Sequence, residues 1–243
     1  MRSNMSKTAI ITGAGTGIGA SIAIAFAEAG YNLALVGRRV EPLEETARQC
    51  GSANIEICAA DVADRQAVQL LAEQTVAAFG RIDILVNNAG INTKKRHLND
   101  IADEDWDRVM EINLTGAFNA FRAVLPQMKV QNDGLVINIS SMAGKRAGMI
   151  SGVAYCASKF GMAALNQSIN VEFREEGIRA CCIYPGEVDT PILDHRPNPV
   201  SDEKRAAALL PEDIAAAAFM VAQMPDRVIV EEITIFPRHV VSR

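Results

Sequence analysis

Short apolar runs alternate with stretches of helical periodicity along the chain, and this alternation restricts the fold more than any other feature. Apolar runs of about four to eight residues between turn residues are typical of buried strands. We therefore predict strands at 8–12, 32–36, 55–59, 82–87, 135–140, 179–184 and 231–236. The intervening stretches predict helices at 18–29, 42–50, 65–79, 104–128 and 152–176, and a last helix that begins at Pro211.

Strands that alternate with helices indicate a parallel sheet, because each connection is a right-handed crossover. A doubly wound sheet with helices on both faces follows. We predict a single α/β domain over residues 1–243, since no repeat or linker divides the chain and such folds often exceed the usual domain length. The segment 190–210 carries three prolines and mixed charge, and we interpret it as a mobile substrate flap.

Composition and charge exclude several classes of protein. With 49% hydrophobic and 22% charged residues the chain is an ordinary globular protein rather than a disordered one. The formal net charge of −5 argues against nucleic-acid binding, which usually needs a basic surface. No apolar run reaches the roughly 18–20 residues that span a bilayer, and residues 1–5 lack the hydrophobic core of a signal peptide.

Cysteines and histidines give no sign of a disulfide framework or a metal site. The five cysteines are odd in number and form no C-x-x-C pair, which favours a reduced, cytoplasmic setting. His97, His195 and His239 are too far apart in sequence for a ligand pair on one helix or loop. We expect no bound metal.

The least ordinary residues of the chain follow four of the predicted strands. In doubly wound sheets, ligands bind beyond the carboxyl ends of the strands, where the strand order reverses. Turns that follow the first, fourth, fifth and sixth strands would meet at this edge of the sheet. They contain a glycine-rich segment, Asn87-Asn88-Ala89-Gly90, Ser140-Ser141 and Pro185-Gly186.

The glycine-rich segment runs from Thr12 to Gly19, between the first strand and the first helix. Glycines allow a tight turn and a close approach of the backbone to a pyrophosphate, whose charge then lies at the helix N-terminus. The spacing is G-x-x-x-G-x-G, and the more familiar G-x-G-x-x-G does not fit because residue 18 is Ile. A tight turn without a nucleotide is the alternative interpretation.

The residues after the second strand bear on the choice of cofactor. Folds of this type that bind NAD place an acid here for the ribose 2′-hydroxyl. This chain has Gly37-Arg38-Arg39 instead. A guanidinium pairs well with a 2′-phosphate, so the sequence favours NADP(H), with NAD(H) left open. The alternative is two solvated arginines at a helix start.

Tyr155 and Lys159 are four residues apart in a predicted helix, so their side chains lie on the same face. A free tyrosine has a pKa near ~10 and exchanges protons poorly at neutral pH. A neighbouring ammonium favours the phenolate and lowers that pKa. Ser141, at the end of the fifth strand, offers a hydroxyl to a substrate oxygen. Together these residues suggest acid–base chemistry at a carbonyl or alcohol.

Along almost its whole length the sequence resembles the short-chain dehydrogenase/reductase family. The resemblance rests on TGAGTGIG at 12–19, Asp61-Val62, NNAG at 87–90, Asn113 in EINLTG, Ser141 in NISSMAG, Tyr155-x-x-x-Lys159 and Tyr184-Pro185-Gly186. It implies a Rossmann fold with sheet order 3-2-1-4-5-6-7 and an NAD(P)-dependent oxidoreductase. It also implies a homo-oligomer, a tetramer or a dimer, with the two long helices at an interface.

The resemblance also implies roles for individual residues. Tyr155 would exchange the proton, Lys159 would hold the ribose and tune Tyr155, Ser141 would orient the carbonyl, and Asn113 would help to hold a proton-relaying water. Asp61 and Val62 would border the adenine, and Val188 and Thr190 would meet the nicotinamide amide. The full expected cofactor set is Gly13, Gly15, Thr16, Gly17, Ile18, Gly19, Arg38, Arg39, Asp61, Val62, Asn88, Ala89, Gly90, Tyr155, Lys159, Pro185, Gly186, Val188 and Thr190.

Two departures from the family pattern concern selectivity rather than chemistry. Relatives that prefer NADP often carry a basic residue where this chain has Thr16, which weakens the NADP(H) prediction. The interval from Ser141 to Tyr155 is one residue longer than is common in the family, which would alter the wall of the pocket.

The substrate is expected to be a small carbonyl compound or secondary alcohol. Basic loops at 93–97 and 145–146 should overhang the catalytic edge and would favour an anionic substrate, unless these charges are simply solvated. A ketoacyl reductase that uses a carrier protein is disfavoured, because Asn132 and Glu176 stand where such enzymes tend to be basic. Two alternatives remain: a non-catalytic NADP(H)-sensing regulator on the same fold, and a 3-ketoacyl-type reductase that acts on small ketoacyl substrates.

Overall fold

A computed structural model describes residues 6–238, so His239 and the segment 1–5 discussed above lie outside the described part of the chain. Its seven strands form one sheet in the order β3-β2-β1-β4-β5-β6-β7, and every neighbouring pair is parallel. This confirms the predicted sheet. The strands are β1 (Thr8–Thr12), β2 (Asn32–Gly37), β3 (Ile55–Ala59), β4 (Ile84–Asn87), β5 (Gly134–Ile139), β6 (Ile178–Pro185) and β7 (Glu232–Ile235).

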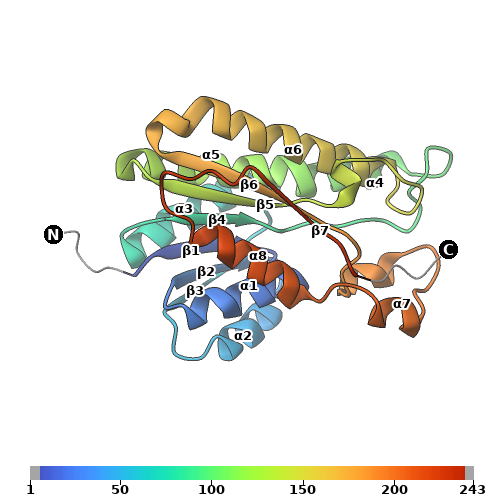
Figure 1. The fold of residues 1–243 in the computed structure, drawn as a ribbon, viewed down its shortest axis with the longest axis horizontal. Helices are drawn as coiled ribbons and strands as arrows, with labels where there is room; N and C mark the ends of the chain where they lie inside the picture. Colours follow the sequence, from blue (N-terminus) through green and yellow to red (C-terminus); the bar gives the residue numbers. More distant parts are fainter. Residues whose placement is uncertain (1–5, 239–243) are drawn as a thin grey trace.

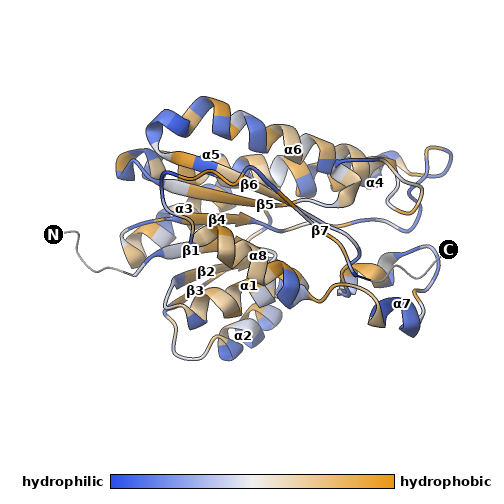
Figure 2. Ribbon diagram, in the orientation of Figure 1, coloured by the Kyte–Doolittle hydropathy of each residue, from blue (hydrophilic) through white to orange (hydrophobic). Residues whose placement is uncertain are grey.

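Helices cover both faces of the sheet, as predicted (Figure 1). On one face lie α1 (Gly17–Glu28), α2 (Val40–Gln49) and α8 (Pro211–Ala222). On the other lie α3 (Arg65–Phe79), α5 (Gly116–Gln131) and α6 (Val153–Phe173), with α4 (Asp103–Met110) beside α6. In Figure 2 the strands are mostly orange, and much of the blue lies on the outer helices and on α7 (Asp202–Ala206).

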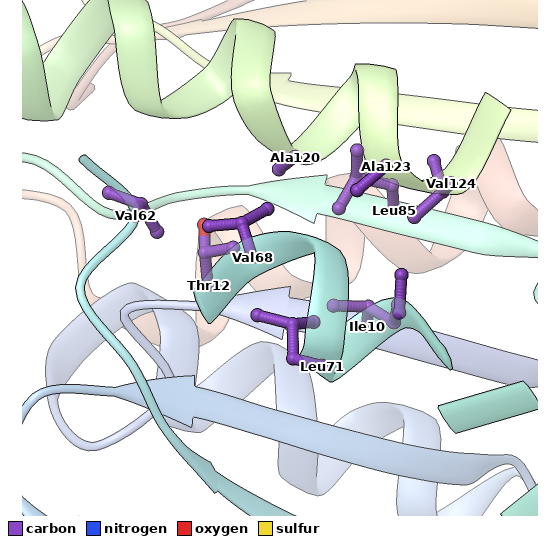
Figure 3. Close-up of a pocket in the computed structure, with 10 residues that line it drawn as sticks. Ile10, Thr12, Val62, Val68, Leu71, Leu85, Ala120, Ala123 and Val124 are labelled. Atoms are coloured by element: carbon purple, nitrogen blue, oxygen red, sulfur yellow. The ribbon is translucent and has the colours of Figure 1, made fainter. Parts of the chain in front are cut away.

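The strands serve two cores because their side chains alternate between the faces of the sheet. In β1, Ala9 and Ile11 pack toward α1 and α8, whereas Ile10 packs toward α3 and α5. Between Ile10, Leu71 and Val124 the second core leaves an apolar gap (Figure 3). It has no room for a water molecule, so it is an imperfection of packing and not a ligand site.

The long helix predicted at 104–128 is interrupted. α4 ends at Met110, a π-helical turn follows at Glu111–Thr115, and α5 continues to Gln131. A π-helical turn is wider than an α-helical one and often occurs at functional sites. This turn contains Asn113. The sequence did not predict the turn itself, because the spacing of apolar residues does not reveal a single widened turn.

The segment 190–210 contains more regular structure than an irregular flap would. It includes a 3₁₀ turn at Pro191–His195 and the short helix α7. A β-bridge between Val188 and Leu209 joins its two ends, and Arg205 pairs with Asp189 at 2.7 Å. The segment therefore leaves the edge of the sheet and returns to it as a closed loop. Within residues 6–238, no helix is long and apolar enough to cross a membrane.

Candidate active site

Asn88 fastens the turn after β4 to the glycine-rich turn after β1. Its amide nitrogen donates to the carbonyl oxygens of Thr12 and Gly13, at 3.0 and 3.1 Å. The Thr12 hydroxyl accepts from the backbone N–H groups of Asn88 and Ala89, at 3.0 and 3.1 Å. Both turns lie at the switch in strand order, between β1 and β4. The predicted ligand edge is thus assembled from residues far apart in the chain.

The glycines of this turn are required by close packing. Gly13 and Gly17 have φ angles of 66° and 55°, which favour glycine. A Cβ at Gly19 would lie 2.2 Å from the Gly13 carbonyl oxygen. Among the described residues no side chain caps the first turn of α1, so its N–H groups face outward. Such a bare helix N-terminus fits a pyrophosphate.

Four residues were expected around the adenine and its ribose, and they differ in exposure: the two arginines are exposed and Val62 is buried. Arg38 and Arg39 are exposed at the end of β2, where Arg39 precedes the first turn of α2. Asp61 accepts from the N–H of Ala63 at 3.0 Å, and its carboxylate is thereby fixed beside this end of the sheet. Val62, the next residue, is buried. The structure brings these residues to one edge of the sheet without locking Arg38 or Arg39 in place.

The Ser141 hydroxyl is near enough to the Tyr155 phenol to influence its pKa. The Lys159 ammonium lies 5.6 Å from the centre of the Tyr155 ring and donates to the Ile139 carbonyl at 2.8 Å. Burial raises the pKa of Tyr155, and the Ser141 hydroxyl and the charge of Arg96 counteract that effect. Burial lowers the pKa of Lys159 to about 8. The predicted catalytic residues therefore lie together.

Asn113 is completely buried and acts as a brace. Its side chain accepts from the N–H of Ile91 at 2.8 Å and donates to the Ile91 carbonyl at 3.0 Å. It also donates to the Ser158 hydroxyl at 3.1 Å, and that hydroxyl donates to the Tyr155 carbonyl at 2.8 Å. The widened turn thus connects the loop after β4 to α6, the helix that carries Tyr155 and Lys159. Its expected part in holding a water stays a prediction.

Gly90 and the end of β6 complete the edge. A Cβ at Gly90 would lie 3.4 Å from the Asn113 amide oxygen and 3.7 Å from the Lys159 nitrogen, so this glycine leaves the space above Lys159 open. After Pro185, the N–H of Gly186 donates to the Ile235 carbonyl at 2.7 Å. Val188 is buried. Thr190 lies against Gly17, where a Cβ would be 3.2 Å from its methyl group.

Two of the basic residues expected to overhang the catalytic edge have partners on or beside β7. The Lys145 ammonium pairs with Glu232 of β7 at 2.5 Å and lies 4.3 Å from the centre of the Tyr184 ring, so its charge is partly neutralised. Arg146 lies 5.9 Å from the ring of Phe236. Sequence could not reveal these partners, since β7 lies far from residue 145 along the chain.

Sequence reasoning also missed the pair formed by Arg196 and Glu187. The Arg196 guanidinium lies 2.9 Å from the Glu187 carboxylate, without hydrogen-bond geometry. Arg196 lies in the segment 190–210, and no sequence motif there indicated a role for it. Among residues 6–238 no group of three or more histidine, cysteine or acidic side chains has the arrangement of a metal site.

Comparison with known proteins fits this geometry. A sequence model described as short chain dehydrogenase matches residues 7–200. Sepiapterin reductase of Chlorobaculum tepidum is 36% identical over 242 residues, which cover 96% of this chain and 97% of that protein.

Two solved structures show the same architecture and were determined with nicotinamide cofactors. Alcohol dehydrogenase from Thermococcus sibiricus, complexed with 5-hydroxy-NADP, has a TM-score of 0.87 at 29% identity, with 98% of this chain and 99% of that chain covered. A 3-ketoacyl-(acyl-carrier-protein) reductase from Brucella melitensis, complexed with NADH, has a TM-score of 0.87 at 27% identity, with 97% and 99% covered. The chain belongs to the short-chain dehydrogenase family.

Proposed function

We propose that this enzyme transfers a hydride between NADP(H) and a small carbonyl compound or secondary alcohol, with Tyr155 as the proton donor and acceptor. The convergence of Ser141, Tyr155 and Lys159 carries the proposal. A sensing regulator would need none of these three groups. A carrier-protein reductase is disfavoured further, because Glu176 pairs with Lys129 at 3.0 Å and leaves that surface without net positive charge.

The chemistry divides between the cofactor and the chain. NADPH, when bound, supplies the hydride to the carbonyl carbon. The Ser141 hydroxyl is held by the N–H of Ala143 at 3.2 Å and is placed to bond the carbonyl oxygen. Tyr155 donates its phenolic proton to that oxygen, and burial keeps the phenol protonated until the transfer because it raises the pKa. Lys159 stabilises the phenolate that remains.

The cofactor preference is proposed from Arg38 and Arg39. An exposed guanidinium at the end of β2 suits the 2′-phosphate of NADP(H), and no acid stands there to bond a 2′-hydroxyl. Related structures contain cofactors of both kinds, so NAD(H) remains the second candidate. We place the phosphates at Gly13, Gly15, Thr16, Gly17, Ile18 and Gly19, and the nicotinamide near Asn88, Ala89, Gly90, Pro185, Gly186, Val188 and Thr190.

We further propose a homo-oligomer, a tetramer or a dimer, that uses the outer faces of α5 and α6. Several large apolar side chains are exposed there, among them Phe118, Phe160 and Val171. Phe118 and Phe160 are 40% and 45% exposed, and Val171 is 70% exposed. Exposed apolar side chains that gather on one face are typical of interfaces, and these three lie on the two helices assigned to it. Light scattering coupled to size-exclusion chromatography measures the subunit number, and a monomer would refute the assignment.

A panel of ketones, aldehydes and oxo acids with NADPH tests the proposed reaction. We expect oxidation of NADPH by at least one carbonyl substrate. Tyr155→Phe should bind NADPH normally and lose at least ~100-fold in kcat, which is the usual contribution of acid–base catalysis. If no carbonyl is reduced, or if Tyr155→Phe keeps normal turnover, the proposed function is wrong.

A further inference from the structure

Ser141 lies at the start of a short 3₁₀ turn, Met142–Gly144, that closes on itself. The Ser141 hydroxyl accepts from the N–H of Ala143, and the Gly144 N–H donates to the Ser141 carbonyl at 2.8 Å. Because these bonds are internal to the turn, they fix its shape but not its place in the molecule. The position of the Ser141 hydroxyl therefore depends on what holds the turn as a unit.

One side of the turn packs against α6, the helix that carries Tyr155 and Lys159. A Cβ at Gly144 would lie 2.7 Å from the Lys159 carbonyl oxygen and 2.6 Å from the Ser140 hydroxyl, so a residue larger than glycine does not fit. The Ser140 hydroxyl donates to the same carbonyl at 3.3 Å. The turn thus lies directly on α6 at Lys159.

The other side of the turn is held by β7, the strand beyond β6 at one edge of the sheet (Figure 1). Lys145 follows the turn directly, and its ammonium donates to the Glu232 carboxylate at 2.5 Å. The second oxygen of that carboxylate accepts from the Tyr184 hydroxyl at 3.1 Å, and the Lys145 ammonium lies 4.3 Å from the centre of the Tyr184 ring. The side chains of Lys145, Tyr184 and Glu232 therefore form one cluster, which we call the β7 clamp.

The β7 clamp is better ordered than an ordinary surface ion pair. The side chains of Lys145 and Glu232 are 34% and 37% exposed, and an isolated pair of such exposure contributes little to stability. Tyr184, however, is 1% exposed and lies in β6, which pairs with β7. A carboxylate that already accepts from this buried tyrosine loses less side-chain freedom when it binds Lys145. The acceptor for Lys145 is therefore held in place in advance.

We propose that Glu232 is a positioning residue: through Lys145 it holds the turn after Ser141 against α6, and it thereby sets the place at which the Ser141 hydroxyl meets the substrate carbonyl. A strand that contains none of the residues proposed for catalysis then controls the alignment of the reacting groups. Misplacement of a reacting group by about 1 Å is enough to lower a rate markedly. The proposal rests on the carbonyl reduction proposed above and adds a residue to it.

Single-turnover reduction by NADPH of a carbonyl compound from the panel above tests the role of Glu232. Glu232→Gln should slow hydride transfer about 5- to 20-fold and leave the Kd for NADPH within about twofold, because no proposed cofactor contact is changed. Lys145→Met should have the same effect, and Lys145→Arg, which keeps the ion pair, should restore most of the rate. Glu231→Gln removes the same charge from the neighbouring exposed position and should keep the parental rate. A parental rate in both Glu232→Gln and Lys145→Met overturns the proposal.

A double variant shows whether Glu232 acts through Ser141. Ser141→Ala removes the hydroxyl and should slow hydride transfer about 100-fold. Adding Glu232→Gln to Ser141→Ala should then change the rate by no more than about twofold, since no hydroxyl remains to be positioned. A general loss of stability would slow both backgrounds alike. Losses that multiply in the double variant overturn the proposal.

Amide hydrogen exchange of the enzyme–NADPH complex tests the β7 clamp without any reaction. In Glu232→Gln the amides of residues 142–146 should exchange about fivefold faster than in the parent, the equivalent of losing a partly exposed ion pair. Glu231→Gln should match the parent. Faster exchange in an enzyme that reduces no carbonyl supports the clamp and refutes the proposed function. Unchanged exchange in an enzyme that does reduce carbonyls supports the proposed function and overturns the positioning role of Glu232.

Discussion

The two ends of the site differ in how firmly their side chains are held. At the catalytic end, Lys159 and Asn113 are at most 3% exposed, and the side chain of each donates a hydrogen bond to a protein acceptor. At the adenine end, Arg38 and Arg39 are exposed. The first arrangement fixes atoms for chemistry, and the second leaves charge free to meet a ligand. Changes at the catalytic end should therefore reduce stability as well as activity, whereas changes at the adenine end should alter selectivity alone.

A chain of buried asparagines illustrates the first arrangement. The Asn87 amide donates to Asn138 at 2.9 Å, Asn138 donates to Asn166 at 2.9 Å, and Asn166 donates to the Glu231 carbonyl at 3.2 Å. These contacts connect β4, β5, the catalytic helix α6 and the residue before β7 in one line. A buried donor that loses its acceptor lowers the free energy of unfolding, because the donor is left without a hydrogen bond.

The largest effect should come from breaking that chain in the middle. Asn138→Leu leaves the Asn87 donor and the Asn166 acceptor without their main partners, at roughly 1–3 kcal/mol each, so we expect a loss of about 4 kcal/mol in unfolding free energy. Urea denaturation measures the loss. Asn198→Leu, at an exposed position, is the control and should change stability by less than about 0.5 kcal/mol. Equal stability of the two variants would contradict the comparison.

The glycine-rich turn should be almost as sensitive. In Gly19→Ala the new methyl group would lie 2.2 Å from the Gly13 carbonyl oxygen and 2.5 Å from the Asn88 amide nitrogen. Because backbone must move, we expect a loss of about 3 kcal/mol, at the upper end of ordinary overpacking, and weaker binding of NADPH. Gly148→Ala is the matched control, since its Cβ would meet nothing within 4 Å. A Gly19→Ala variant as stable as Gly148→Ala would show that the turn is not tightly packed.

Lys159 gives a smaller effect that depends on pH. Its pKa is about 8 in the folded protein, against 10.5 for an ordinary lysine. Between these values the unfolded chain binds more protons than the folded protein, so stability should rise as the pH increases from 8 to 10. Relative to Lys159→Met, which cannot titrate, the parent should gain on the order of 2 kcal/mol over this range. A constant difference between the two across the range would mean that Lys159 is not desolvated.

Regular features of the sequence were sufficient for the fold. The alternation of strands and helices predicted all seven strands, because a buried parallel strand must be apolar whatever its neighbours are. The proximity of the three residues proposed for catalysis was also foreseen, since Tyr155 and Lys159 are one helical turn apart and Ser141 follows a strand that ends at the same edge. Local spacing and one topological rule predict both.

Contacts between distant segments could not be foreseen in the same way. Lys145 pairs with Glu232, 87 residues later, and nothing near either residue indicates the other. Arg96 stands in a run of basic residues, and only the packing of Gly152 against it shows that it is buried. The role of Asn113 in the π-helical turn could not be foreseen either, because its side chain braces the loop at Ile91, 22 residues earlier in the chain.

The exposed end should show the smallest change in stability and a clear change in selectivity. Arg38→Asp removes a solvated side chain, so unfolding free energy should stay within about 0.5 kcal/mol of the parent. Loss of a charge-assisted contact should weaken NADPH binding about 10- to 100-fold, while the new carboxylate accepts from a ribose hydroxyl and improves NADH. Fluorescence titration of both cofactors and thermal unfolding measure the two quantities. Equal affinity for both cofactors in the parent would refute the role of Arg38, and a marked loss of stability would show that this end is anchored after all.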